Sequence, residues 1–221
     1  VRDNKVYMRT TKSIKQVDVI YRRVDDEFID PLQFDSDSVL GVAGLLNAAR
    51  FGNVSIANAV GNGVADDKLI YSYMPEIIKY YLNEEPLINN VQTYRLDDPD
   101  VCEYALANKE KLVFKPVDAS GGYGLVIGPH ASEQELVEME NQVRANPRGY
   151  IAQPVVQLST SPTYDGKSIS PRHVDLRPFV VNDGVEPWAV PGGLTRVALP
   201  EGSLVVNSSQ GGGSKDTWVL S

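Results

Sequence analysis

The chain has 221 residues, of which 42% are hydrophobic and 23% are charged, and its formal net charge at pH 7 is -8. Such a chain is long enough for a globular protein with a buried core. Its acidity argues against non-specific binding to DNA or RNA phosphates, but leaves open a local basic pocket for one nucleotide. No apolar run approaches the roughly 18 residues of a membrane span, and we recognise no signal peptide. We therefore expect neither a nucleic-acid partner nor a membrane partner.

Cys102 is the single cysteine, so no disulfide can form within the chain. That count fits a reducing compartment, and we expect the protein in the cytoplasm. The residues around Cys102, from 101 to 106, have the spacing of a partly buried helix. A buried structural thiol is therefore favoured over a catalytic one.

The first third of the chain predicts strands around one helix. Short β-branched and aromatic runs at 6–8 and 17–21 are typical of strands, as is the run 54–60. Residues 38–51 have the apolar spacing of a helix, whose inner side would carry Val39, Val42, Leu45 and Leu46. The charged run 22–27 could bind a metal ion or an amine substrate, but a solvated face is the favoured interpretation.

Lys68 lies where a glycine loop, 61–65, leads into a predicted helix that Asp66 or Asp67 caps and that continues to about Leu82. A cation in the first turn of a helix opposes the helix macrodipole. An anionic ligand at the helix N-terminus would relieve that unfavourable placement. The alternative is a solvated lysine beside the two aspartates, and the two interpretations carry similar weight.

Lys115 ends a predicted strand, 112–115, and is followed by a glycine-rich loop that ends at Gly124. Glycines let backbone N–H groups approach an anion closely, and the lysine adds a positive charge. The loop therefore suits the phosphates of ATP, while a plain β-hairpin turn with a surface lysine is an equal alternative. It is neither a P-loop nor a dinucleotide-binding fingerprint, because no Gly-Lys-Ser/Thr follows and no helix opens directly after it.

The rest of the chain mixes helices with strands. Asp98-Pro99 predicts a helix start, and Ser132–Glu135 is a capping box that opens a helix to about Ala145. The other predicted elements are strands at 125–128, 150–158, 173–181, 188–199 and 204–206, followed by a polar glycine loop at 207–216. This order predicts an α+β fold with mainly antiparallel sheets.

Two arginines lie on the C-terminal strands, Arg177 and Arg196. The guanidinium fork suits bidentate recognition of a phosphate or a carboxylate. Alternatively, Asp175 and Arg177 lie on one face of their strand and simply pair with neighbours. The polar loop 207–215 has no hydrophobic role, so it is either mobile or a clamp on a ligand.

Together these segments resemble the circularly permuted ATP-grasp family, whose members are often described as glutathionylspermidine-synthase-like. The similar segments run in family order over nearly the whole chain: 19–26, 30–32, 38–42, 58–68, 114–124, 151–154, 173–179, 192–199 and 202–220. The resemblance implies an ATP-grasp fold in which two α+β subdomains clasp ATP. We expect a central sheet with helices at 1–98, a glycine-loop ATP subdomain at 99–155 and a catalytic sheet at 156–221.

The resemblance also implies roles for individual residues. ATP would be contacted by the lysines Lys68 and Lys115, by the loop Ser120, Gly121, Gly122, Tyr123 and Gly124, and by Gln153 at the adenine. The reacting groups would face Arg196, Arg177, Asn207 and Lys215, with Asp175 in the same cleft. Family members carry an upstream half that supplies much of the Mg²⁺ site, so Asp118 and Asn207 are the only candidate metal ligands here.

The implied function is an ATP-dependent ligase that joins a carboxylate to an amine through an acylphosphate, with ATP and Mg²⁺ as cofactors. Its substrates would be small molecules or peptides. The rival hypothesis is a non-catalytic module that binds a nucleotide or a partner protein and serves in assembly. A third is a phosphotransferase to a hydroxyl, which would yield no amide.

Overall fold

The computed structural model describes residues 1–119, 122–182, 184–207 and 211–220. The chain divides into two compact units, Val1–Tyr71 and Ser72–Ser221. None of the helices in the described residues has the length and hydrophobicity that a membrane span requires.

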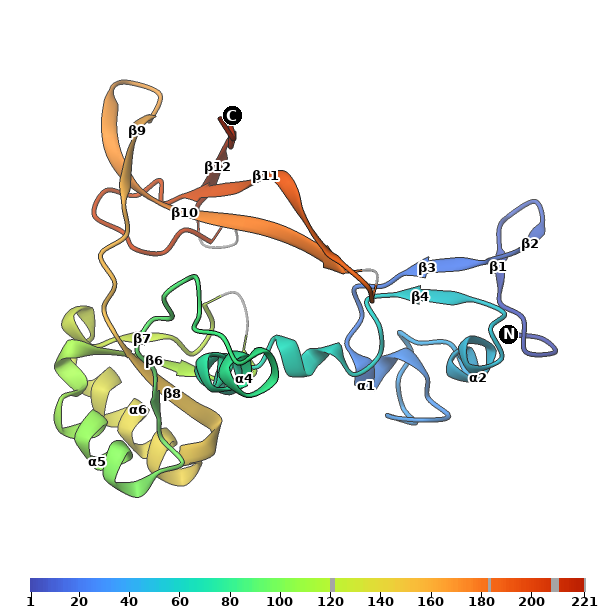
Figure 1. Cartoon of the computed structure of the whole chain (residues 1–221), viewed down its shortest axis with the longest axis horizontal. Coiled ribbons are helices and arrows are strands. Elements are labelled where there is room, and N and C mark those ends of the chain that lie inside the picture. Colours follow the sequence, from blue (N-terminus) through green and yellow to red (C-terminus); the bar gives the residue numbers. More distant parts are fainter. Residues whose placement is uncertain (120–121, 183, 208–210, 221) are drawn as a thin grey trace. The chain divides into compact units, whose positions relative to one another are not determined.

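The first unit contains small sheets and short helices (Figure 1). β1 (Tyr7–Arg9) and β2 (Ile14–Gln16) form an antiparallel hairpin. β3 (Val19–Tyr21) and β4 (Ser55–Ala57) run parallel, and the connection between them contains α1 (Asp26–Ile29) and α2 (Leu45–Arg50). The core of this unit is formed by Val6, Ile29, Leu45, Leu46, Ala48 and Val54.

Asp30 is completely buried and explains why α2 is shorter than predicted. Its carboxylate accepts hydrogen bonds from the backbone N–H groups of Leu32, Gly44 and Leu46, at 2.9 to 3.0 Å. These bonds draw the chain into turns before Leu45, where the helix begins. The predicted helix over 38–51 is therefore wrong in its first half, and Val39 is 93% exposed rather than packed inside.

The charged run 22–27 was expected to form a solvated face, but one of its residues is buried. Only 9% of Arg22 is exposed. Its guanidinium donates to the carbonyl oxygens of Asn58, Val24 and Ala59 and forms an ion pair with Asp26. Arg22 thereby ties the end of β3 to the loop that follows β4. This role is structural, and the sequence pattern alone did not distinguish it from a surface position.

One long helix was predicted from Asp66 or Asp67 to about Leu82, and the structure divides it. The chain forms a 3-10 turn, η1 (Asn62–Ala65), then α3 (Lys68–Ser72) and α4 (Met74–Leu82). The break falls at Tyr73, just before Pro75 in the first turn of α4. Proline lacks an N–H group and its ring clashes with the carbonyl one turn earlier, so it begins a helix rather than continuing one.

The second unit contains a four-stranded antiparallel sheet covered on one face by two helices (Figure 1). The strands are β5 (Tyr94–Arg95), β6 (Leu112–Pro116), β7 (Val126–Ile127) and β8 (Tyr150–Pro154), in the order β5-β8-β6-β7. The helices are α5 (Pro99–Ala107) and α6 (Glu133–Ala145), and 3-10 turns occupy η2 (Lys109–Lys111), η3 (Gly128–His130) and η4 (Pro147–Gly149). Phe114 and Ala152, directly opposite each other, are fully buried against the helices.

The thiol of Cys102 lies in this core, on α5, and is free. Burial raises the pKa of the thiol, which keeps it protonated and weakly nucleophilic. Both observations agree with the predicted structural role of this residue.

Both predicted helix starts are confirmed. The Asp98 carboxylate accepts from the N–H groups of Asp100 and Val101 at the start of α5. Ser132 and Glu135 form a complete capping box at the start of α6. Hydrogen bonds from Ser132 also hold the pKa of Glu135 below its ordinary value.

Replacing Ser132 with Ala should lower the free energy of unfolding by about 1 kcal/mol, because the N–H group of Glu135 loses its acceptor. Since the pKa of Glu135 is lowered in the folded state, its contribution is present at neutral pH and is lost as the pH falls through that pKa. Urea unfolding followed by circular dichroism measures both effects. The exposed Ser159→Ala is the matched control, and an equal loss there would contradict the capping role.

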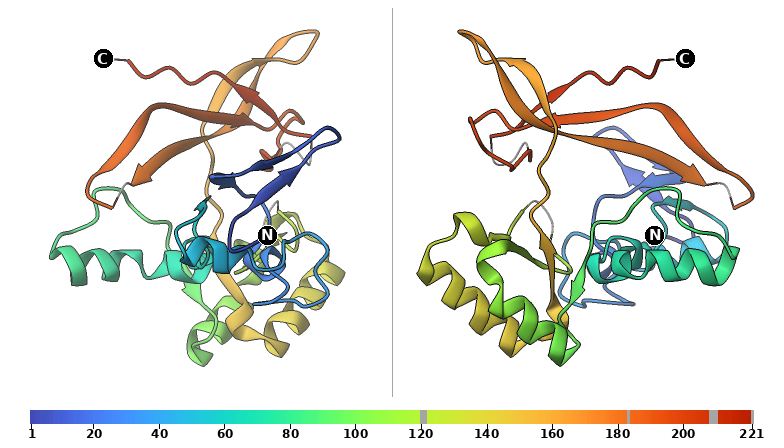
Figure 2. Two further views of the ribbon diagram at one scale, coloured as in Figure 1. Left: turned by 90° about the vertical axis from the view of Figure 1, so that its right-hand side faces the viewer. Right: turned by 60° about the vertical axis from the view of Figure 1, so that its left-hand side comes forward.

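A second antiparallel sheet follows β8 and is dominated by one long hairpin (Figure 2). Its strands are β9 (Thr160–Tyr164), β10 (Ile169–Asn182), β11 (Pro187–Val197) and β12 (Gly213–Lys215), in the order β12-β11-β10-β9. The predicted pair 173–181 and 188–199 is thus confirmed, whereas 204–206 is not a strand and part of the predicted loop 207–216 forms β12. The strand predicted over 150–158 ends at Pro154, where its pairing with β6 ends.

Candidate functional site

Lys115 and Gln153 form a polar pair on the sheet face opposite the helices. The register places Lys115 opposite Ile151 and Val113 opposite Gln153, so the two side chains are diagonal neighbours on one face. Lys115 Nζ donates to Gln153 Oε1 at 2.7 Å, and Gln153 Nε2 donates to Thr93 Oγ1 at 2.8 Å. Gln153 is 7% exposed, which fixes its amide and orients the ammonium of the half-buried Lys115.

The loop after β6 is a hairpin connection, as predicted, because β6 pairs antiparallel with β7. Gly122 and Gly124 have φ angles of 81° and 68°, which favour glycine strongly over other residues. Tyr123 between them is 70% exposed. Ser120 and Gly121 lie outside the described residues, so the structure describes this loop at 117–119 and again from Gly122 onward.

The structure brings together Arg196, on β11, and Asn207, in the loop between β11 and β12. Arg196 Nη1 donates to Asn207 Oδ1 at 3.0 Å. Asp175 is the direct cross-strand neighbour of Arg196, and its Oδ2 accepts from Arg177 Nε at 3.2 Å and Nη2 at 3.0 Å. The local pairing of Asp175 with Arg177, one of the two predicted alternatives, is therefore present.

Two atoms in this cluster are buried and form no hydrogen bond with the described residues: Arg196 Nε and Asp175 Oδ1. Buried polar atoms are usually paired, so an unpaired donor and an unpaired acceptor on neighbouring strands call for a partner such as an ordered water or a ligand. Asp175 therefore belongs with the candidate residues. Thr93 belongs with them as well, because it accepts a hydrogen bond from Gln153. Thr93 carried no sequence signal, since only the strand register brings it to Gln153.

Lys215 lies apart from Arg196 although the two are near in sequence. The register pairs Arg196 with Ser214 and Thr195 with Lys215, so Lys215 lies on the other face of the sheet. Its ammonium donates to the carbonyl oxygen of Pro162 at 2.9 Å. Lys68 is half-buried at the start of α3 in the first unit, where the Asp67 carboxylate accepts from the N–H group of Leu69 at 2.7 Å.

The two candidate metal ligands are Asp118 and Asn207. Asp118 is exposed, and the side-chain Oδ1 of Asn207 accepts from Arg196 Nη1. The described residues contain no group of three or more His, Cys, Asp or Glu side chains that could hold a metal ion. Mg²⁺ prefers several oxygen ligands in octahedral geometry, which these two residues do not provide by themselves.

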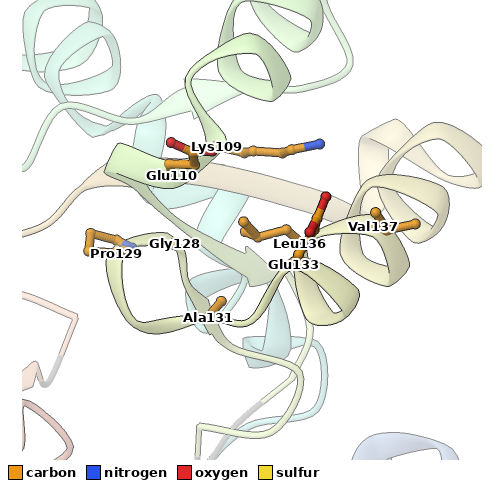
Figure 3. A pocket seen from close by; sticks show the side chains of 8 residues that line it. All are labelled: Lys109, Glu110, Gly128, Pro129, Ala131, Glu133, Leu136 and Val137. Carbon is orange, nitrogen blue, oxygen red and sulfur yellow. The ribbon is translucent and has the colours of Figure 1, made fainter.

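A pocket of about 650 Å³ lies between η2, η3 and the start of α6 (Figure 3). It is lined by Lys109, Glu110, Gly128, Pro129, Ala131, Glu133, Leu136 and Val137. None of these residues was predicted to bind ATP. Lys109 forms an ion pair with Glu140, and the hydrogen bonds from Lys109 and Arg144 lower the pKa of Glu140. The lining residues that the structure describes therefore offer no free cation for a phosphate.

Comparison with known proteins assigns the chain to a family. The family model for circularly permuted ATP-grasp type 2 proteins matches residues 1–198. An uncharacterized protein of Mycobacterium tuberculosis is 63% identical over 99% of this chain, which covers 40% of that protein. An uncharacterized protein of Synechocystis is 57% identical over the whole chain, which covers 46% of it.

Some relatives have a functional name, such as the "Putative glutamate--cysteine ligase 2-3" of Frankia alni, which is 50% identical over 99% of this chain. This chain covers 25% of that protein, and less than half of each of the relatives named above. The solved structure of D-alanyl-alanine synthetase A of Vibrio cholerae aligns with a TM-score of 0.47 and 11% sequence identity. The alignment covers 97% of this chain and 56% of the synthetase chain, and the family assignment does not rest on it. The chain belongs to the circularly permuted ATP-grasp type 2 family.

Proposed function

We propose that this chain is the nucleotide-binding part of an ATP-dependent ligase that joins a carboxylate to an amine through an acylphosphate. The observation that carries the proposal is the buried Gln153 amide, which orients the Lys115 ammonium next to a glycine hairpin. Family membership and the name of the Frankia relative support the same reaction class. The proposal also includes that the protein is similar to glutathionylspermidine synthase in particular and that it is located in the cytoplasm.

The reaction has two steps. An oxygen of the substrate carboxylate attacks the γ-phosphorus of ATP, the bond to the β-phosphate oxygen breaks, and ADP leaves. The amine then attacks the carbonyl carbon, an amide forms, and phosphate and a proton are released. Positive groups that are fixed in advance stabilise the charge of the transferring phosphoryl group, because they need no reorganisation during the step.

Lys115 and Lys68 would bind the phosphates, and the loop from Ser120 to Gly124 would cover them and exclude water from the acylphosphate. Arg196, which Asn207 holds in place, would bind the acylphosphate or the incoming substrate. The Gln153 amide accepts from Lys115 and donates to Thr93, so we propose that it positions Lys115 beside the nucleotide. Family enzymes of this class work with Mg²⁺, and the described residues contain no group of three or more His, Cys, Asp or Glu side chains that could hold the ion.

The competing function is a non-catalytic module that binds a nucleotide or a partner protein. The two functions differ in turnover. With Mg-ATP and mixtures of amino acids, peptides and polyamines, the full natural polypeptide should release ADP several-fold faster than with ATP alone, and mass spectrometry should detect an amide. ATP binding without any stimulated ADP release would favour the non-catalytic module, and a phosphorylated alcohol without amide would indicate a phosphotransferase.

A further inference from the structure

The sheet formed by β3 and β4 has two strands and is covered on one face only. The strands pair in parallel, Val19 with Ser55, Ile20 with Ile56 and Tyr21 with Ala57. Parallel sheets in proteins are almost always covered on both faces, because the crossover connections place helices there. Two-stranded sheets also gain little stability alone. A parallel pair with a bare face therefore requires an explanation.

One face of this sheet is covered in the expected way. Ile20 and Ile56, opposite each other in the register, pack against the core that contains Ile29, Leu45 and Leu46. Two of these core residues lie on α2, within the connection from β3 to β4. This face thus has the cover that a strand–helix–strand unit normally supplies.

The other face is bare. Val19 is 65% exposed and Tyr21 is 72% exposed, and their cross-strand partners Ser55 and Ala57 are exposed too. Side chains two residues apart on a strand share a face, so these four form one continuous surface, here called the outer face. Aromatic and β-branched side chains that share a surface are typical of a covered sheet face rather than a solvated one.

We propose that an amphipathic helix from a segment of the natural polypeptide outside residues 1–221 covers the outer face. Relatives that are 63% and 57% identical over this chain continue beyond it, since the chain covers 40% and 46% of their lengths. These relatives therefore carry additional chain that can cover the sheet in the same molecule. A helix is the occupant because helices cover the faces of parallel strands. The inference does not depend on the ligase proposal.

Thiol labelling tests this inference, because the chain's own cysteine, Cys102, is buried. Tyr21→Cys and Val19→Cys would each be made in residues 1–221 and in the full natural polypeptide. Thr11→Cys, exposed in the turn between β1 and β2, is the matched control. The rate of maleimide labelling at each site is measured by peptide mass spectrometry, and sedimentation gives the mass of each protein.

We expect labelling at positions 19 and 21 to be at least tenfold slower in the full polypeptide than in residues 1–221, with no change at Thr11→Cys. Hydrogen exchange of residues 17–22 in the unmodified proteins should slow in parallel, which excludes an artefact of the substitutions. Equal labelling in both forms would overturn the proposal. So would slow labelling in residues 1–221 together with a doubled mass, because the occupant would then be a second copy.

Discussion

Replacing Lys115 with Met should weaken the binding of Mg-ATP about 10- to 100-fold. A charge-assisted hydrogen bond contributes about 1.5–3 kcal/mol, which corresponds to that change in dissociation constant. The fold should survive, because Lys115 is half-buried and Met preserves the volume of its side-chain stem. Titration calorimetry of Mg-ATP against the full polypeptide measures the effect, and ADP release should fall at least as much.

The matched control is Lys111→Met, which removes an exposed lysine just before the same strand. It should leave the affinity for Mg-ATP within about twofold, because an exposed charge at this distance is screened by salt. Equal affinities of wild type and Lys115→Met would remove Lys115 from the phosphate site. Gln153→Leu adds a further comparison: it keeps the lysine but removes its acceptor, so it should weaken binding less than Lys115→Met does.

The Lys115 site shows which parts of the molecule were predictable from sequence. The strand, the glycine hairpin and the lysine at the end of the strand follow from local patterns, and the structure has all three. The pairing of Lys115 with Gln153 and Thr93 does not, because these residues are 38 and 22 positions away from Lys115. They meet only through the register of β6 and β8 and the neighbouring chain before β5. Sequence spacing contains no information on that register.

The failures have the same physical origin. The predicted helix over 38–51 relied on apolar spacing, and a buried carboxylate 14 residues upstream of Gly44 overrides that spacing by capturing backbone N–H groups. The family resemblance grouped Lys215 with Arg196, yet the alternation of side chains along the strands places the two residues on opposite faces of the sheet. By contrast, the capping residues Asp98 and Ser132 act within one turn of chain, so their prediction needed no tertiary information.

Asp30→Ala should destabilise the first unit by about 3 kcal/mol or more. The carboxylate is completely buried and accepts three backbone hydrogen bonds, two of them at the start of α2. Its removal leaves three N–H groups without an acceptor and creates a cavity, and both effects are costly in a buried site. The two tryptophans, Trp188 and Trp218, lie in the second unit, so their fluorescence reports poorly on this change. Hydrogen exchange of residues 45–50 measures it directly.

Asp30→Asn separates the charge of Asp30 from its shape. The amide keeps the volume but offers one acceptor oxygen and places an NH₂ group against a backbone donor, so it should still destabilise the unit substantially. Asp35→Ala is the control, because Asp35 is exposed and accepts one N–H group, that of Asp37, at 2.9 Å. It should change stability by no more than about 1 kcal/mol. Unchanged exchange of residues 45–50 in Asp30→Ala would show that apolar packing alone sets the start of α2.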